Sequence, residues 1–229
     1  MVLHMKTWDW FLTNNNYQKP KIKQKGTWDK GIDYEITYKT FQNDLKKLKN
    51  KKILYKKDLK KYAYLIVFLT QLRNGCRIWE AIVSIINFCL NHNTIDWANP
   101  TVLIRTQKRS DGTTREIILP KCIKKEDIEK VRPIFLDIVK EFENAKTIEE
   151  KQKIREKIVK RLNAWLYKNY NKLNSHSLRY AYITYLSKKG IPAQILAKIT
   201  KHKNINYIEH YTQSKLAKEI LKNIGDVDD

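Results

Sequence analysis

The fold of this 229-residue chain is constrained most by one apolar stretch, residues 62 to 72, with the sequence YAYLIVFLTQL. Because almost every position is apolar, the stretch predicts a helix that is buried on all sides. It has only about half the length that a membrane-spanning helix requires. Gly75 then ends the helix, and from Arg77 onward apolar residues recur at helical spacing, which predicts a second, amphipathic helix.

The charge of the chain indicates the kind of partner. Its net charge is +22, far more than solubility requires, so we expect an extended polyanion, and nucleic acid fits better than a membrane. A hydrophobic share of 42% is typical of a globular protein. We see no signal peptide and no cysteine pair at zinc spacing, so we expect a cytoplasmic protein without a structural metal, in which Cys76, Cys89 and Cys122 are small buried apolar residues.

The first 55 residues interleave lysines with tryptophans and tyrosines. Such a segment can follow a DNA backbone, with amines on phosphates and rings on sugars or bases. It can equally be a solvated arm whose tryptophans pack on the rest of the protein. Residues 41 to 61 predict a short helix followed by a basic linker. We therefore divide the chain into an N-terminal segment, 1–55, and a main domain, 56–229.

Residues 101 to 120 alternate around Asp111-Gly112, a residue pair that favours a type I′ turn, and so predict a β-hairpin. With a two-residue turn at this pair, Lys108 would lie opposite Arg115. Two cations in that position are unfavourable unless an anion lies between or near them. The hairpin therefore predicts an anion close to its tip.

The rest of the chain reads as helices. Residues 124–142 and 148–170 predict two charged amphipathic helices that serve packing alone. Another helix should begin at Asn174 or Ser175 and end at Gly190. We thus expect a mainly helical fold with one small antiparallel β-hairpin or sheet.

Two shorter helices are expected near the C-terminus. Pro192 favours the start of the first, in which Ile195, Leu196 and Ile199 are expected to pack inward. The second covers about residues 214–222.

The residues between 176 and 211 include groups suited to phosphate chemistry. Arg179 offers a planar fork of donors that stays charged and fits two phosphate oxygens. His176 and His202 can donate to a phosphate or move a proton near neutral pH. Tyr211 carries a phenol that can form a covalent intermediate. We expect these four side chains to surround one DNA phosphate.

These residues resemble the C-terminal signature of the tyrosine recombinases, the phage-integrase family. That signature has an HxLR motif, matched by residues 176–179, then a histidine about two dozen residues later, matched by His202. A tyrosine follows nine residues further on, as Tyr211 does here. The chain departs from the pattern at Lys201, where the family usually has glycine, and at Tyr180, where a second histidine is frequent.

A second box supports the resemblance. Residues 75–80, GCRIWE, resemble the family's TGLRxSEL box, which holds its first catalytic arginine, here Arg77. Trp79 replaces a small residue, and the rival Arg73 stands before the glycine. The family carries a catalytic lysine on a hairpin, which points to Lys108. The implied catalytic residues are Arg77, Lys108, His176, Arg179, His202 and Tyr211, in a catalytic domain of the recombinase fold at 56–229. The resemblance also implies that residues 1–55 are either an arm or a reduced form of the family's N-terminal core-binding domain.

The resemblance also implies a reaction. Tyr211 attacks a backbone phosphorus, which forms a 3′-phosphotyrosyl link and releases a 5′-hydroxyl. Arg77 and Arg179 hold the nonbridging oxygens and stabilise the charge of the pentavalent state. Lys108 protonates the leaving 5′-oxygen.

The two histidines complete this scheme. His202 donates to a nonbridging oxygen, and His176 assists proton transfer at the tyrosine. No ATP and no metal are needed, because the bond energy is kept in the phosphotyrosine. The implied function is integration or excision of a mobile element by a dimer or tetramer on double-stranded DNA.

Two alternatives remain open from the sequence. Type IB topoisomerases share this active site but rejoin the same strand, and they usually carry lysine or arginine where His176 stands. Residues 191–211 also resemble a helix-turn-helix, which would make the chain a DNA-binding protein without catalytic activity.

Overall fold

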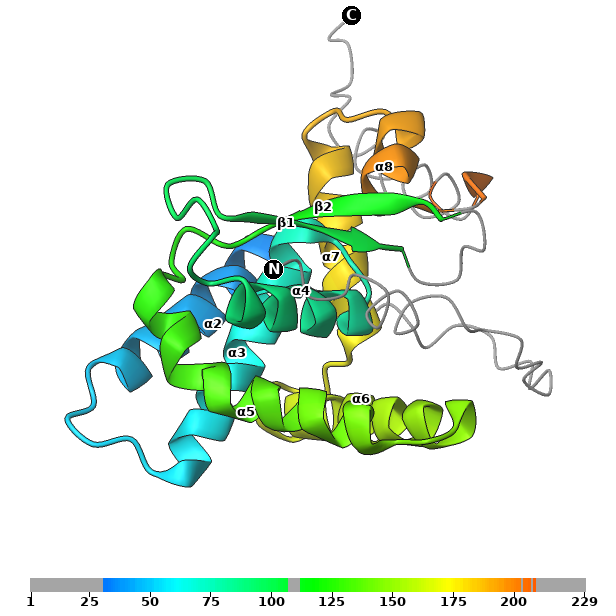
Figure 1. The fold of residues 1–229 in the computed structure, drawn as a ribbon. Coiled ribbons are helices and arrows are strands. Elements are labelled where there is room, and N and C mark those ends of the chain that lie inside the picture. The colour runs from blue at the N-terminus through cyan, green and yellow to red at the C-terminus, as the bar shows by residue number, and fades with distance from the viewer. Residues whose placement is uncertain (1–30, 107–111, 203, 207, 209–229) are drawn as a thin grey trace, which may run out of the picture.

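The computed structural model describes residues 31–106, 112–202, 204–206 and 208 (Figure 1). In these residues the fold is mainly helical with one two-stranded antiparallel sheet, which confirms the predicted fold class. The elements are α2 (Tyr34–Lys49), α3 (Lys56–Asn74), α4 (Ile78–Leu90), β1 (Thr101–Arg105), β2 (Thr114–Ile118), α5 (Lys125–Asn144), α6 (Ile148–Asn169), α7 (Ser175–Lys188) and α8 (Ala193–Thr200).

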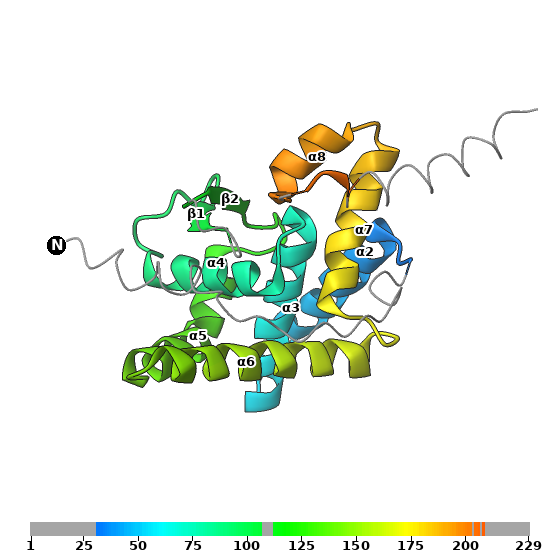
Figure 2. The same ribbon diagram turned by 90° about the vertical axis from the view of Figure 1, so that its right-hand side faces the viewer.

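Helix α3 lies at the centre of the protein, as the apolar stretch predicts. Its residues 62–72 are buried apart from Tyr64, which is partly exposed, and the helix packs against α2, α4, α5 and α7 (Figures 1 and 2). Each fully buried Leu, Ile or Phe contributes about 1.5–3 kcal/mol relative to an exposed position. No helix in the described ranges has the length and apolar character to span a membrane. Helix α3 is therefore the element around which the other helices pack.

Helix α2 belongs to the same core. Asp33 caps it by accepting a hydrogen bond from the backbone N–H of Ile36 at 2.8 Å. Its buried apolar side chains, which pack against α3, are Phe41, Leu45 and Leu48. Residues 33–49 therefore pack with the body of the protein. Residues 1–30 lie outside the described part, and the division of the chain at residue 55 stays a prediction.

The hairpin has a different register from the predicted one. Arg115 lies opposite Ile104, so the predicted pairing of Arg115 with Lys108 is wrong. The ladder ends where the backbone N–H and the hydroxyl of Thr106 both donate to the carbonyl of Thr113, each at 2.8 Å. The partner of Arg115 therefore lies four residues earlier in the chain than the predicted one. Lys108 itself lies outside the described residues.

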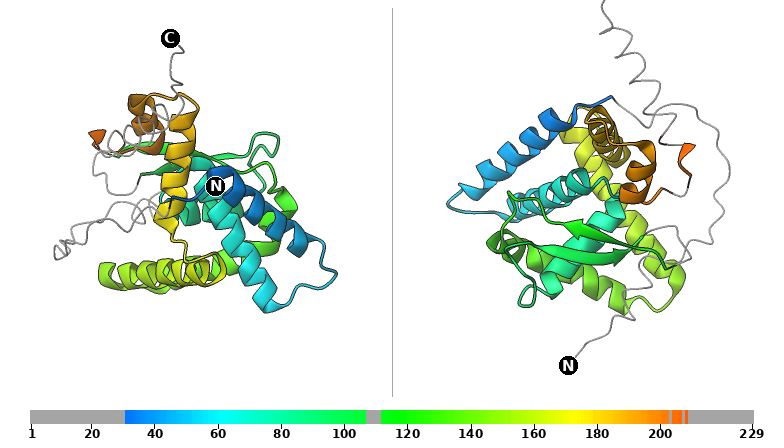
Figure 3. Two further views of the ribbon diagram at one scale, coloured as in Figure 1. Left: turned by 180° about the vertical axis from the view of Figure 1, so that it is seen from behind. Right: turned by 90° about the horizontal axis from the view of Figure 1, so that it is seen from above.

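The hairpin packs against α3 and α4. Figure 3 shows both strands crossing α4 and the end of α3, and contacts of β1 with α4 and of β2 with α3 agree with this view. On the other side of α4 lie α5 and α6, close to their predicted bounds. Cys76 and Cys89 are buried, as predicted, and Cys122 is partly buried.

Helix α7 begins and ends as predicted. Asn174 caps it by accepting from the N–H of Ser177 at 2.9 Å, and Gly190 follows its end with a φ of 81°. The inward face of α8 is narrower than predicted: Leu196 is buried, but Ile195 is 45% and Ile199 38% exposed. Leu196 packs in a small cluster with Ile183 of α7 and with Ile208.

Gly75 ends α3 in a conformation that a larger residue resists. Its φ is 56°, and a Cβ atom would lie 2.2 Å from the ring of Tyr182. We predict that Gly75→Ala lowers the free energy of unfolding by about 3 kcal/mol, from backbone strain and overpacking together. Gly190→Ala is the matched control, since it has a positive φ but no atom within 4 Å of the added Cβ, and should cost about 1 kcal/mol. Urea denaturation measures both, and equal losses would contradict the steric argument.

Candidate functional site

Arg77 lies at the start of α4, where the sequence places it. The segment leaves α3 at Gly75, and Arg77 then adopts an extended N-cap conformation. Its backbone N–H donates to Glu80 Oε2 and its Nη1 donates to Glu80 Oε1, both at 3.0 Å. The side chain keeps 22% of its surface exposed, and Glu80 anchors its guanidinium.

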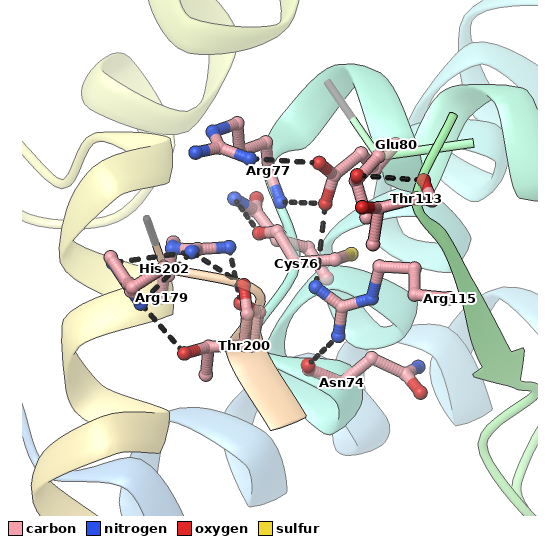
Figure 4. Close-up of polar contacts among 12 residues, drawn as sticks. Asn74, Cys76, Arg77, Glu80, Thr113, Arg115, Arg179, Thr200 and His202 are labelled. Carbon is pink, nitrogen blue, oxygen red and sulfur yellow. Dashed lines mark hydrogen bonds and ion pairs between the residues drawn. The ribbon is translucent and has the colours of Figure 1, made fainter. Parts of the chain in front are cut away.

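Glu80 is the buried acid of the site. Its carboxylate is fully buried and also lies 3.4 Å from Nη1 of Arg115 (Figure 4). Burial alone would raise the pKa of Glu80, but the charges of Arg115, Arg77 and Arg179 outweigh it and lower that pKa below its usual value. The carboxylate is therefore ionised at neutral pH.

Arg115 joins the hairpin to the helices. Its Nη2 donates to the carbonyl of Asn74 at 2.6 Å, and Arg115 as a whole is only 5% exposed. The side chain of Asn74 also pairs with the backbone of Ile118 in both directions, at 2.8 and 3.0 Å. The predicted hairpin register requires an anion between or near Lys108 and Arg115. Instead, the carboxylate that Arg115 meets belongs to Glu80.

Arg179 connects three separate parts of the chain. Its Nη1 donates to the carbonyl of Gly75 and its Nη2 to the carbonyl of Thr200, both at 2.8 Å (Figure 4). The same Nη2 lies 3.2 Å from each ring nitrogen of His202. Burial lowers the pKa of Arg179 to about 10, although Glu80 opposes this effect, so the guanidinium stays charged at neutral pH.

His202 follows the end of α8. Lys201 takes a left-handed conformation, with φ 56°, which lets the N–H of His202 donate to Ala197 at 3.0 Å. This turn directs the imidazole toward Arg179. Burial and then the charges of nearby arginines, Arg179 first, lower the pKa of His202 to about 3. The ring is therefore neutral at neutral pH.

The first turn of α7 lies beside this site. Gln71 on α3 is buried and donates to the carbonyls of Ser175 and Cys76, at 2.8 and 3.2 Å. It thus links the residue before His176 to the residue before Arg77. The side chain of His176 is exposed.

Of the six predicted site residues, three converge in the structure: Arg77, Arg179 and His202 (Figure 4). His176 lies one turn before Arg179 on α7, and Lys108 and Tyr211 lie outside the described residues.

Sequence reasoning missed the buried polar residues that hold the three together. Two of them had a signal: Arg115 alternates with the buried Ile117 and Leu119 along one strand face, and Glu80 falls on the glutamate of the box that holds Arg77. The missed residues are Gln71, Asn74, Glu80, Arg115 and Thr200.

The arrangement favours an anion. Three guanidiniums, those of Arg77, Arg115 and Arg179, surround one carboxylate, and the neighbouring histidine is neutral. The positive charge in excess lies in a largely buried region, where an anion is attracted more strongly than in water. Arg77 is more exposed than Arg115, with 22% of its side-chain surface accessible against 4%. Among the described residues, no three His, Cys, Asp or Glu side chains gather as a metal site requires.

Comparisons with known proteins agree with one another. Residues 49–218 match the sequence model of the Phage integrase family. An uncharacterized protein of Methanocaldococcus jannaschii is 64% identical over 98% of this chain and 100% of its own length. A candidate integrase of Acidianus two-tailed virus is 36% identical over 90% of this chain and 72% of its own length.

Solved structures with a similar fold include XerA recombinase. It has 14% sequence identity and a TM-score of 0.46, over 90% of this chain and 68% of its own. The integrase of transposon Tn1549, solved in complex with a circular intermediate DNA, has 15% identity and a TM-score of 0.39, over 90% and 67% of the two chains.

We predict that Glu80→Gln lowers the free energy of unfolding by about 3 kcal/mol at neutral pH, because it removes the carboxylate that the buried arginines share. The folded-state pKa of Glu80 lies below its unfolded value, so its contribution is present above that value and is lost as the pH falls through the folded pKa. Urea titrations at several pH values should show the two proteins converging in acid. Glu141 offers the control, because it forms an exposed ion pair with Lys157. Glu141→Gln should change the free energy of unfolding by less than about 0.5 kcal/mol.

His202 also makes the free energy of unfolding depend on pH. Its folded-state pKa of about 3 lies below the ordinary value of 6.5, so the unfolded chain binds the proton more readily. We predict that stability falls as the pH drops from 6.5 toward 3, with a slope of at most about 1.4 kcal/mol per pH unit. In His202→Gln this slope should be smaller, as thermal unfolding across that range would show. An unchanged slope would mean that the ring is solvated in the folded protein.

Proposed function

The chain belongs to the phage integrase family, and on that premise we propose that it is a site-specific tyrosine recombinase that cleaves and rejoins DNA through a 3′-phosphotyrosyl link. One observation supports this most: Arg77 and Arg179, 102 positions apart in the sequence, converge with His202 around a buried carboxylate. Two fixed guanidiniums and an imidazole are suited to the nonbridging oxygens of one phosphodiester.

In the proposed reaction the arginines act electrostatically. Arg179 is held by two backbone carbonyls and Arg77 by Glu80, so both are oriented before DNA arrives. Preorganised donors of this kind stabilise the charge that builds on the pentavalent phosphorus without rearranging during the reaction. The phenol of Tyr211 attacks the phosphorus, and the 5′-oxygen leaves.

Lys108 is the proposed acid for that leaving oxygen. It belongs to the connection between β1 and β2, and Asn74 and Arg115 fix β2 to the helices that carry Arg77. His176 is proposed to assist proton transfer at Tyr211. No nucleotide or metal enters the scheme.

The proposed substrate is double-stranded DNA at a recombination site, bound by a dimer or tetramer. A net charge of +22 supports a nucleic-acid partner. The Tn1549 integrase was solved with DNA, and the viral relative is named as a candidate integrase. Integration or excision of a mobile element is accordingly the role we propose.

Tyr211→Phe tests the nucleophile. A nicked duplex carrying the sequence that flanks the gene traps the covalent intermediate, because the short 5′-hydroxyl fragment diffuses away. We predict that wild-type protein forms a covalent adduct, visible as a slower band on a denaturing gel, and that Tyr211→Phe forms none while its DNA affinity is unchanged. Tyr207→Phe, four residues earlier, is the matched control and should still form the adduct.

Adducts that persist in Tyr211→Phe would remove this residue from the role. The same gel separates a DNA-binding protein without catalysis, for which neither protein would form an adduct. Relaxation of a supercoiled plasmid carrying two sites, without exchange between them, would identify a topoisomerase instead of a recombinase.

A further inference from the structure

The hydroxyl of Thr200 contacts the imidazole of His202. Thr200 is the last residue of α8 and is fully buried. Its Oγ1 lies 2.6 Å from Nδ1 of His202 and also 2.6 Å from the carbonyl oxygen of Leu196. Both contacts are short enough to be strong hydrogen bonds.

The single proton of that hydroxyl decides the direction of both bonds. A carbonyl oxygen can only accept, so the hydroxyl of Thr200 donates to Leu196. Its proton is then no longer available for the ring. The contact with His202 must therefore run the other way, with Nδ1–H donating to Oγ1. In a neutral imidazole this leaves Nε2 without a proton.

The contact with Arg179 does not determine which ring nitrogen of His202 carries the proton. Its Nη2 lies 3.2 Å from both ring nitrogens of His202, so it could donate to whichever nitrogen lacks a proton. With Nδ1 protonated, Nε2 is the acceptor. Thr200 also positions Arg179, because its backbone carbonyl accepts from the same Nη2 at 2.8 Å.

We propose that Thr200 is a positioning residue that fixes His202 as the Nδ1–H tautomer, so that Nε2 accepts from Arg179 before a phosphate arrives. The tautomer follows from the contacts alone. Its consequence for DNA rests on the proposed function.

That consequence is proton uptake on phosphate binding. Burial and the charges that face the ring, from Arg179 on α7, Arg77 at the start of α4 and Arg115 on β2, hold the pKa of His202 at about 3. An Nε2 that carries no proton cannot donate to a phosphate oxygen, and its lone pair repels that oxygen. When His202 engages the phosphate, Nε2 takes a proton from solvent and the ring becomes an imidazolium, whose charge the phosphate offsets.

The tautomer is measured directly by ¹⁵N NMR of the full chain with ¹⁵N-labelled histidine rings at neutral pH. His202→Gln assigns the signals. We expect a protonated Nδ1 in the wild type and in Thr200→Ser, which keeps the hydroxyl. In Thr200→Val, which has nearly the same shape but no hydroxyl, we expect the proton to shift toward Nε2. A protonated Nε2 in the wild type, or the same tautomer in Thr200→Val with an unchanged melting temperature, would overturn the inference.

The coupling is tested with inorganic phosphate as the probe, against chloride at equal ionic strength. In phosphate the pKa of His202 in the wild type should rise from about 3 to near neutral, a shift of about four units, because a smaller rise would leave the ring neutral at neutral pH. Phosphate that binds beside a ring that stays neutral would refute the coupling alone. Failure of phosphate to shift any signal of the Arg179 side chain would refute the phosphate site of the proposed function and the coupling with it, and would leave the tautomer result standing.

Discussion

The hydrogen bonds of Arg179 are the interactions on which the rest of the site depends. Arg179 is only 4% exposed, so its guanidinium loses several kcal/mol of hydration and stays charged because its donors are satisfied. The partners come from the end of α3, at Gly75, and from the end of α8, at Thr200. One side chain on α7 therefore fixes the termini of two other helices. The left-handed conformation of Gly75, pressed against Tyr182, places its carbonyl where this donor reaches it.

Glu80 gives the same region its electrostatic balance. A single buried carboxylate meets Arg77 and Arg115, and its field also reaches Arg179. Without it, the guanidiniums would repel one another in a medium that screens charge poorly. With it, the cluster is stable enough to form yet keeps an excess of positive charge. Burial and that excess of positive charge together lower the pKa of the adjacent His202, so its imidazole is neutral beside the arginines.

The sequence predicted those features that depend on neighbouring residues in the chain. The apolar run of α3 could only be a buried helix, and Gly75 placed Arg77 at the start of α4 because glycine favours helix ends. The spacing of the motif predicted that Arg179 and His202 lie in one site, and the two side chains are in contact. The turn pair Asp111-Gly112 gave the wrong hairpin register, since Arg115 pairs with Ile104 and Thr106 bonds to Thr113 in the structure. The buried partners were harder still, since Arg115 and Glu80 are 35 residues apart and meet only in the folded chain.

The departure at Lys201 shows how such a framework tolerates a change in sequence. The backbone there has φ 56° and ψ 42°, a conformation that glycine adopts freely and that costs other residues about 1–2 kcal/mol. This explains why the family pattern has glycine before its histidine. Strained conformations persist where neighbouring bonds over-determine them. Here the N–H of His202 binds Ala197, and both the carbonyl and the hydroxyl of Thr200 are engaged. Those bonds hold the turn on either side of Lys201, so the lysine changes the energy of the turn and leaves the direction of the imidazole as it is.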